Sequence, residues 1–240
     1  MTPSAPIQNF RLPRFAENGY TQWVLQGGRG IYDSAEQIRI EAMAMRVYSA
    51  DERMALEMTM ESPEATLLPQ QNRALSAGPI EIVGANFKVS GVGWEWDGVK
   101  KEIEIKFDVV VEFTQGIADS LQGMGARADA AQKTEIHSGN LVLQTTAEAY
   151  RFEFTQAVHV VSADMDLKSE VLIALADAPQ GQQSGAPVAA AGQLDAVRQL
   201  IAQEKVVIEQ AGRVLRAGRA EFLLRERKAQ FSGLPQIQAE

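Results

Sequence analysis

The stretch at residues 84–113, GANFKVSGVGWEWDGVKKEIEIKFDVVVEF, decides the fold of this chain. Bulky residues alternate with small or polar ones over residues 87–96, and Asp97-Gly98 then interrupts the run with a dipeptide that supports a tight turn. Over residues 103–113 every second residue is apolar, while most residues between them are charged, as in a strand with one buried and one solvated face. The stretch therefore predicts a β-hairpin whose second strand is longer than the usual length of about 5–6 residues and crosses a broad sheet.

The same alternation recurs on both sides of this hairpin. Ser62-Pro63 is expected to end one of the strands, because proline cannot donate to a β-ladder. Residues 7–13 form a short lead, and residues 194–205 remain ambiguous, since Leu194, Val197 and Ile201 also fit helical spacing. The expected strands cover residues 20–32, 38–48, 54–60, 80–83, 136–143, 150–154, 158–161, 165–167, 171–175, 206–209, 214–217, 220–224 and 229–231.

A hairpin unit recurs twice before and twice after a segment rich in Gly, Ala, Gln and Asp. The fold class expected is therefore all-β, with two similar modules at residues 7–114 and 134–238. Residues 115–133 are expected to form a linker or a short helix. Residues 178–193 are low in complexity and predict a mobile loop inside the second module.

Composition excludes several classes of function. The net charge of −8 argues against a nucleic-acid partner, whose phosphates require a basic surface. The chain has no cysteine, so disulfides and thiolate metal sites are absent. No GxSxG, HExxH, phosphate-binding or dinucleotide-binding template occurs, and His137 and His159 fall in different strands, so we expect neither an enzyme, nor a metal, nor a cofactor.

The arrangement of strands and turns resembles the OstA-like β-jellyroll modules of lipopolysaccharide transport. The C-terminal half is similar to LptA in the segment AGRAEFLLRERKAQFSGLPQI, which begins at Ala217, and in Phe152-Glu153-Phe154 followed by Val158-His159-Val160. The N-terminal half is similar to LptC around residues 23–32, in Ser62-Pro63-Glu64-Ala65 and in the hairpin. The resemblance implies that residues 194–208 are extended and that both modules are open jellyrolls.

The resemblance also implies a location and a function. Such proteins act in the periplasm, and LptC-like proteins normally begin with a membrane-spanning helix. This sequence shows neither a signal peptide nor a run of about 18 apolar residues. The implied function is that of a non-enzymatic carrier that binds the acyl chains of lipopolysaccharide or a similar glycolipid in an apolar groove. Through its edge strands it would also join other jellyroll proteins or further copies of itself, with residues 229–237 as the C-terminal edge.

The groove residues are expected to be those whose side chains face the apolar interior. Arg29, Arg216 and Arg219 are candidates for contacts with lipid phosphates at the rim. The alternative is a structural β-repeat module that assembles edge to edge without binding lipid. The candidate groove residues are Trp94, Trp96, Ile103, Ile105, Phe107, Phe152, Phe154, Ile208, Phe222 and Leu224.

Overall fold

The computed structural model describes residues 6–34, 36–113, 134–146, 149–162, 165–177, 197–210, 212–226, 228–233 and 238–239. These residues form almost nothing but antiparallel strands, so the all-β expectation is confirmed. The only helical element described is the 3-10 turn η1 (Pro69–Gln71). The strands are β1 (Ile7–Phe15), β2 (Thr21–Tyr32), β3 (Ile38–Tyr48), β4 (Leu56–Leu68), β5 (Arg73–Gly84), β6 (Phe87–Asp97), β7 (Glu102–Phe113), β8 (Thr134–Ser138), β9 (Asn140–Thr145), β10 (Ala149–Ser162), β11 (Met165–Asp177), β12 (Val197–Gln210), β13 (Arg213–Leu223), β14 (Lys228–Ser232) and β15 (Gln238–Ala239).

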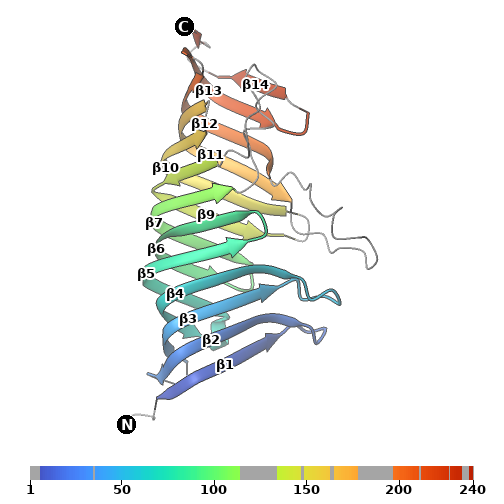
Figure 1. The fold of residues 1–240 in the computed structure, drawn as a ribbon, viewed down its shortest axis with the longest axis vertical. Coiled ribbons are helices and arrows are strands. Elements are labelled where there is room, and N and C mark those ends of the chain that lie inside the picture. Colours follow the sequence, from blue (N-terminus) through green and yellow to red (C-terminus); the bar gives the residue numbers. More distant parts are fainter. Residues whose placement is uncertain are drawn as a thin grey trace.

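All the described strands belong to one sheet, in which each strand from β1 to β7 and from β10 to β14 pairs with the next one along the chain, while β15 pairs with β13. The strands stack along the long axis of the molecule, with the N-terminus at one end and the C-terminus at the other (Figure 1). β8 and β9 together occupy one place in this order, because β7 pairs with β8 over Val109–Phe113 and with β9 over Glu102–Ile105. The sheet therefore continues without a break past residues 114–133.

Most strands bend near their midpoint, and the bends line up across the sheet. The ladder shifts register between Ser90 and Val92, between Thr155 and Val158, and between Gln203 and Val206. Residues with positive φ occupy the bends, including Ala42, Asp108 and Glu204. Bulges of this kind leave residues unpaired and turn the strand. The aligned bends fold the sheet into two layers. We call the opposite side of the molecule, where the strands end in turns, the mouth.

We call the two layers A and B: layer A contains β8 and layer B contains β9, with the corresponding halves of the other strands. Buried apolar side chains from both layers form one continuous core from β2 to β13. Contacts between strands that are not neighbours show that the layers face each other. For example, the rings of Phe87 on β6 and Phe152 on β10 lie 5.0 Å apart in an edge-to-face arrangement.

The bends explain where the expected strand limits were wrong. Ser62-Pro63 does not end a strand, because β4 continues through it to Leu68. The separate strands expected at residues 150–154 and 158–161 are the two halves of β10, joined by the bend at Gln156 and Ala157. The expected lead at residues 7–13 is part of strand β1. At Ser62-Pro63 and at Gln156-Ala157, a local break in the alternation marks a bend and not the end of a strand.

The remaining expectations concern residues 194–208, the linker, the loop and the division into two modules. Residues 197–208 lie in β12, so the extended conformation implied by the resemblance is confirmed there and the helical alternative is wrong. The expected linker at residues 115–133 and the expected loop at residues 178–193 both lie outside the described residues. The division into two modules stays a prediction. Across the described residues, no helix is long and apolar enough to cross a membrane.

Candidate functional site

Nine of the ten candidate groove residues face the core between the layers. Ile105, Phe152 and Phe154 have no exposed surface, and the others are at most 7% exposed. Phe107 is the exception, with 60% of its surface exposed. The alternation that places Ile103 and Ile105 inside is interrupted by the bend at Asp108, where φ is 51°, so Phe107 points outward. Its assignment to the interior was wrong, while lipid binding by the other nine stays a prediction.

Aromatic rings from both layers meet in the middle of the core. Phe87 and Phe113 project from layer A, and Tyr150 and Phe152 project from layer B. Ring centroids lie 5.2 Å apart for Phe87 and Tyr150 and 5.3 Å apart for Phe113 and Phe152, with the rings edge to face. Such pairs contribute about 0.5–1.5 kcal/mol each beyond the area that they bury. The interior is therefore a packed apolar core that holds the layers together.

At the mouth, three hydrogen bonds join layer A to layer B. The Gln22 side-chain amide donates to the Gly98 carbonyl over 3.4 Å, and the Trp23 indole Nε1 donates to Asn72 Oδ1 over 3.2 Å. The Tyr150 hydroxyl donates to the Glu57 carbonyl over 3.1 Å. All three are contacts between distant parts of the chain, so the alternation of the sequence did not reveal them.

Between these contacts the mouth is narrow and apolar. Val47 and Met58 of layer A and Trp96, Ile103 and Leu143 of layer B line it. The cavity there measures only about 20 Å³, which is room for about one water molecule. The layers are thus closed against each other in this structure, and a lipid would have to separate them.

Ionisable groups at the mouth are perturbed by burial. Burial raises the pKa of Glu57, and the nearby positive charge of Lys101 offsets part of that rise. Burial also raises the pKa of Tyr150, with a further contribution from the charge of Glu57. Glu57 Oε2 is buried and has no hydrogen-bond partner among the described residues. Since burying an unpaired carboxylate oxygen is unfavourable, Glu57 opposes the closed arrangement of the mouth.

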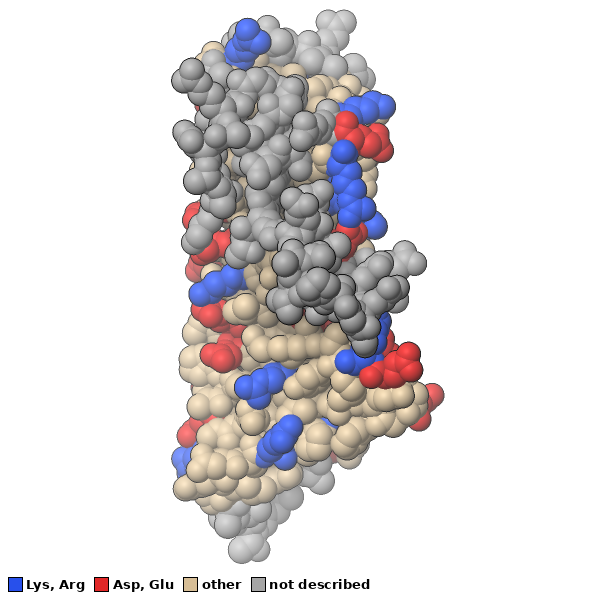
Figure 2. All heavy atoms as spheres, turned by 45° about the vertical axis from the view of Figure 1, so that its right-hand side comes forward, with Lys and Arg blue, Asp and Glu red and all other residues tan. Residues whose placement is uncertain are grey.

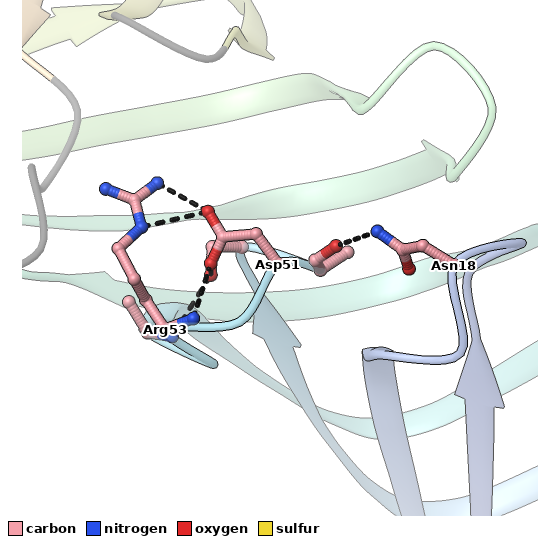
Figure 3. Close-up of polar contacts among 6 residues, drawn as sticks. Asn18, Asp51 and Arg53 are labelled. Carbon is pink, nitrogen blue, oxygen red and sulfur yellow. Dashed lines mark hydrogen bonds and ion pairs between the residues drawn. The ribbon is translucent and has the colours of Figure 1, made fainter.

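The turn that joins β3 and β4 at the mouth is organised by Asp51 (Figure 3). Its carboxylate accepts hydrogen bonds from Arg53 Nε at 2.9 Å and from the Ser49 hydroxyl at 2.8 Å. These bonds, that of Arg53 first, lower the pKa of Asp51 to about 2. Asn18 donates to the Ala50 carbonyl over 2.9 Å and ties the preceding turn of layer A to this one.

The arginines expected at the rim have partners within the protein. Arg29 lies 3.4 Å from Glu41, and Arg219 lies 2.9 Å from Glu221. Figure 2 shows basic and acidic side chains interspersed over one face of the molecule. On the described part of that face, no broad basic field is available for lipid phosphates, and direct phosphate binding by these arginines stays a prediction.

The two histidines come together although they are distant in sequence. His137 on β8 and His159 on β10 are direct cross-strand partners, with ring centroids 6.4 Å apart. His159 Nε2 lies 2.6 Å from Asp166 Oδ2. Within the described ranges, no group of three or more ligating side chains is placed to hold a metal ion.

The fold and the site together define a class: an open antiparallel β-sheet, bent into two layers around an apolar interior that reaches the surface at a mouth. Residues 14–113 match the family model described as lipopolysaccharide-assembly, LptC-related. The resemblance to lipopolysaccharide-transport proteins is confirmed for these residues. No curated protein matches the chain.

Among solved structures, the chain is similar to the crystal structure of LptH, the LptA-homologous periplasmic component of the lipopolysaccharide transport device from Pseudomonas aeruginosa. The sequences are 9% identical, and the match covers 76% of this chain and 93% of that one. The TM-score is 0.32, too low for an argument about this chain to rest on the likeness. The LptA-like character of the C-terminal half therefore stays an expectation.

Proposed function

We propose that this protein is a non-enzymatic periplasmic carrier that takes up the acyl chains of lipopolysaccharide, or of a similar glycolipid, between its two layers. The observation that carries the proposal is the continuous apolar core from β2 to β13, which reaches the surface at the mouth between Met58 and Trp96. The LptC-related family match over residues 14–113 supports the same function.

The energies make such uptake feasible. Breaking the three hydrogen bonds across the mouth costs roughly 0.5–1.5 kcal/mol each, or about 1.5–4.5 kcal/mol in total. Each methylene moved from water into an apolar environment contributes about 0.8 kcal/mol. About two to six buried methylenes offset the loss of these bonds alone. Contacts between the layers that are lost on opening would have to be replaced by contacts with the acyl chain, which needs no catalytic or charged residue.

The test uses Trp96 and Phe107, which are both aromatic and lie on adjacent strands but on opposite sides of the layer. Trp96 is 5% exposed and lines the mouth, whereas Phe107 is 60% exposed on the outer face. Each is replaced in turn by photoreactive p-benzoylphenylalanine, and delipidated protein is irradiated with lipopolysaccharide. We expect crosslinks from position 96 and few from position 107. Equal capture at both positions, or none at either, would favour the structural β-repeat alternative.

A second comparison separates interior from surface by charge. Ile105 has no exposed surface and Lys106 is exposed on the other face of β7. Ile105→Glu places a charge among acyl chains, where burying an unpaired charge is costly, whereas Lys106→Glu leaves its charge in water. Among variants that keep the native β circular dichroism spectrum, we expect Ile105→Glu alone to lose lipid capture.

We also propose that the protein joins other jellyroll proteins through its edge strands. In the sheet order, β1 stands at one end and β14 at the other, so each of these strands has a partner on one side only. Unpaired backbone groups at such edges can pair with another chain. Residues 234–237 of the expected C-terminal edge lie outside the described residues. Proline at both Gln230 and Phe231 in β14 removes two successive backbone donors, and unchanged self-association and partner binding would argue against this edge.

A further inference from the structure

A second concave surface lies on the outside of layer A, away from the lipid path. It is a hollow of about 760 Å³ beside the bends of β3 to β7. Glu61 and Glu81 on its rim alternate with Met60 and Ile82, which have no exposed surface. Side chains of successive residues in a strand point to opposite faces, so the hollow faces solvent and not the core. Its volume falls in the range in which proteins bind small molecules or a few side chains.

The floor of the hollow is apolar and consists of small or cyclic residues, among them Ala42, Pro63, Pro79 and Gly91. A Cβ atom on Gly91 would lie 2.5 Å from Cγ2 of the buried Ile105, so position 91 points toward the core and only its backbone borders the hollow. The two prolines sit where the β4–β5 ladder is interrupted, so their missing N–H groups cost no hydrogen bond. The depression is therefore a consequence of the bends.

Three carboxylates are among the residues that line the hollow. Glu61 and Glu81 are direct cross-strand partners, and Asp108 stands on the same rim. Lys88 lies 2.9 Å from Glu81, but no ion pair joins Glu61 or Asp108 to another residue in the described part of the chain. Like charges directly opposite each other on a sheet destabilise it, so a bound cation at this place would relieve repulsion.

An exposed aromatic ring is a direct neighbour of two residues that line the hollow. Phe107 precedes Asp108 and is the cross-strand partner of Val92, which lines the hollow. With 60% of its surface exposed, it is among the most exposed of the large apolar side chains described. An aromatic face next to a carboxylate can accept both an apolar side chain and a cation.

We propose that this outer hollow docks a short segment of a partner protein in which Lys or Arg side chains alternate with apolar ones. The apolar side chains would rest on the floor and against Phe107, and the cations would meet Glu61 and Asp108, since Lys88 already pairs with Glu81. The carboxylates repel phosphate groups, so an anionic lipid surface and the headgroup of a transported glycolipid do not fit the hollow. The proposal is independent of lipid uptake at the mouth.

The test measures the fluorescence anisotropy of a short fluorescein-labelled peptide in which lysine and leucine alternate, in low-salt buffer. The key variant combines Glu61→Gln with Asp108→Asn; asparagine is chosen because it tolerates the positive φ of position 108. Glu209→Gln is the matched control, since Glu209 is an exposed carboxylate on β12, far from the hollow along the sheet. A peptide with glutamate in place of lysine controls for adhesion of leucine.

We expect saturable binding of the lysine peptide to the parent protein. The double variant should weaken it by roughly five- to tenfold, as two exposed charge contacts would, and Phe107→Ser should weaken it as well. Equal weakening by Glu209→Gln, equal binding of the glutamate peptide, or no saturable binding would overturn the proposal. Calcium chloride is titrated in parallel, and saturable calcium binding without peptide binding would assign the carboxylates to a metal cation instead.

Discussion

Ser62→Ala tests whether the bend of β4 is held by a side chain that links three strands. The Ser62 hydroxyl is buried and lies 2.8 Å from the Glu64 carbonyl and 2.7 Å from the Pro79 carbonyl, and it accepts from the Trp94 indole Nε1 at 3.3 Å. Its loss removes a donated hydrogen bond worth about 1 kcal/mol. It also leaves the indole N–H of Trp94, which is 1% exposed, without a partner, at a cost of roughly 1–3 kcal/mol. We therefore expect the free energy of unfolding to fall by about 2–4 kcal/mol.

The chain offers matched controls for this prediction. Ser138 and Ser169 are also buried at bends, and each donates to the carbonyl two residues later, over 3.0 Å. Among the described residues no indole donates to either hydroxyl, so Ser138→Ala and Ser169→Ala should each cost only about 1 kcal/mol. The assay is urea denaturation followed by circular dichroism, repeated in a Trp94→Phe background. If Ser62→Ala costs no more than the two controls, or costs the same with and without Trp94, the indole bond does not stabilise the bend.

Three further predictions concern the mouth, a turn and another bend. Burial raises the pKa of Glu57 above its usual 4.5, so the folded state binds the proton more tightly than the unfolded state does. The contribution of Glu57 to stability should therefore rise as pH falls toward 4.5. In urea denaturation measured over a range of pH, Glu57→Gln should be more stable than the parent near pH 7 and should lose this dependence. The pKa of Asp51 is lowered from 3.8 to about 2, so the stability that Asp51 contributes is fully present above pH 3.8 and is lost as pH falls toward 2. Asp51→Asn should remove this loss of stability at acid pH. An unchanged fall in stability below pH 3.8 would contradict the role given to Asp51. Gly93 has φ of +69°, so Gly93→Ala should destabilise by about 1–2 kcal/mol in thermal unfolding, and a neutral result would show that this bend relaxes.

Much of the sheet could be predicted from the sequence alone. The alternation in residues 103–113 predicted strand β7, and residues 38–48 were predicted with the limits that β3 has. Burial of nine candidate groove residues followed from the same rule, because side chains two apart in a strand share a face. A period of two is a local property, and therefore a single sequence is enough to show it.

The bends could not be predicted in this way. At Ser62-Pro63, and between Phe154 and Val158, the alternation breaks as it would at the end of a strand. Whether the strand continues past such a break depends on neighbouring strands having bulges at the matching position. That alignment is set by pairing between segments that are distant in the sequence. Phe107 shows the consequence, since one bulge beside it reversed the face on which its ring lies.

The amino-acid sequence by itself therefore determined the strand-forming segments and the apolar face of each, since both depend on residues close together in the chain. Only the tertiary structure decided that these faces close against each other, that Trp23 meets Asn72 and Tyr150 meets Glu57 across the mouth, and that a hollow lies beside the bends. These features depend on contacts between residues up to 93 positions apart, which no local pattern specifies.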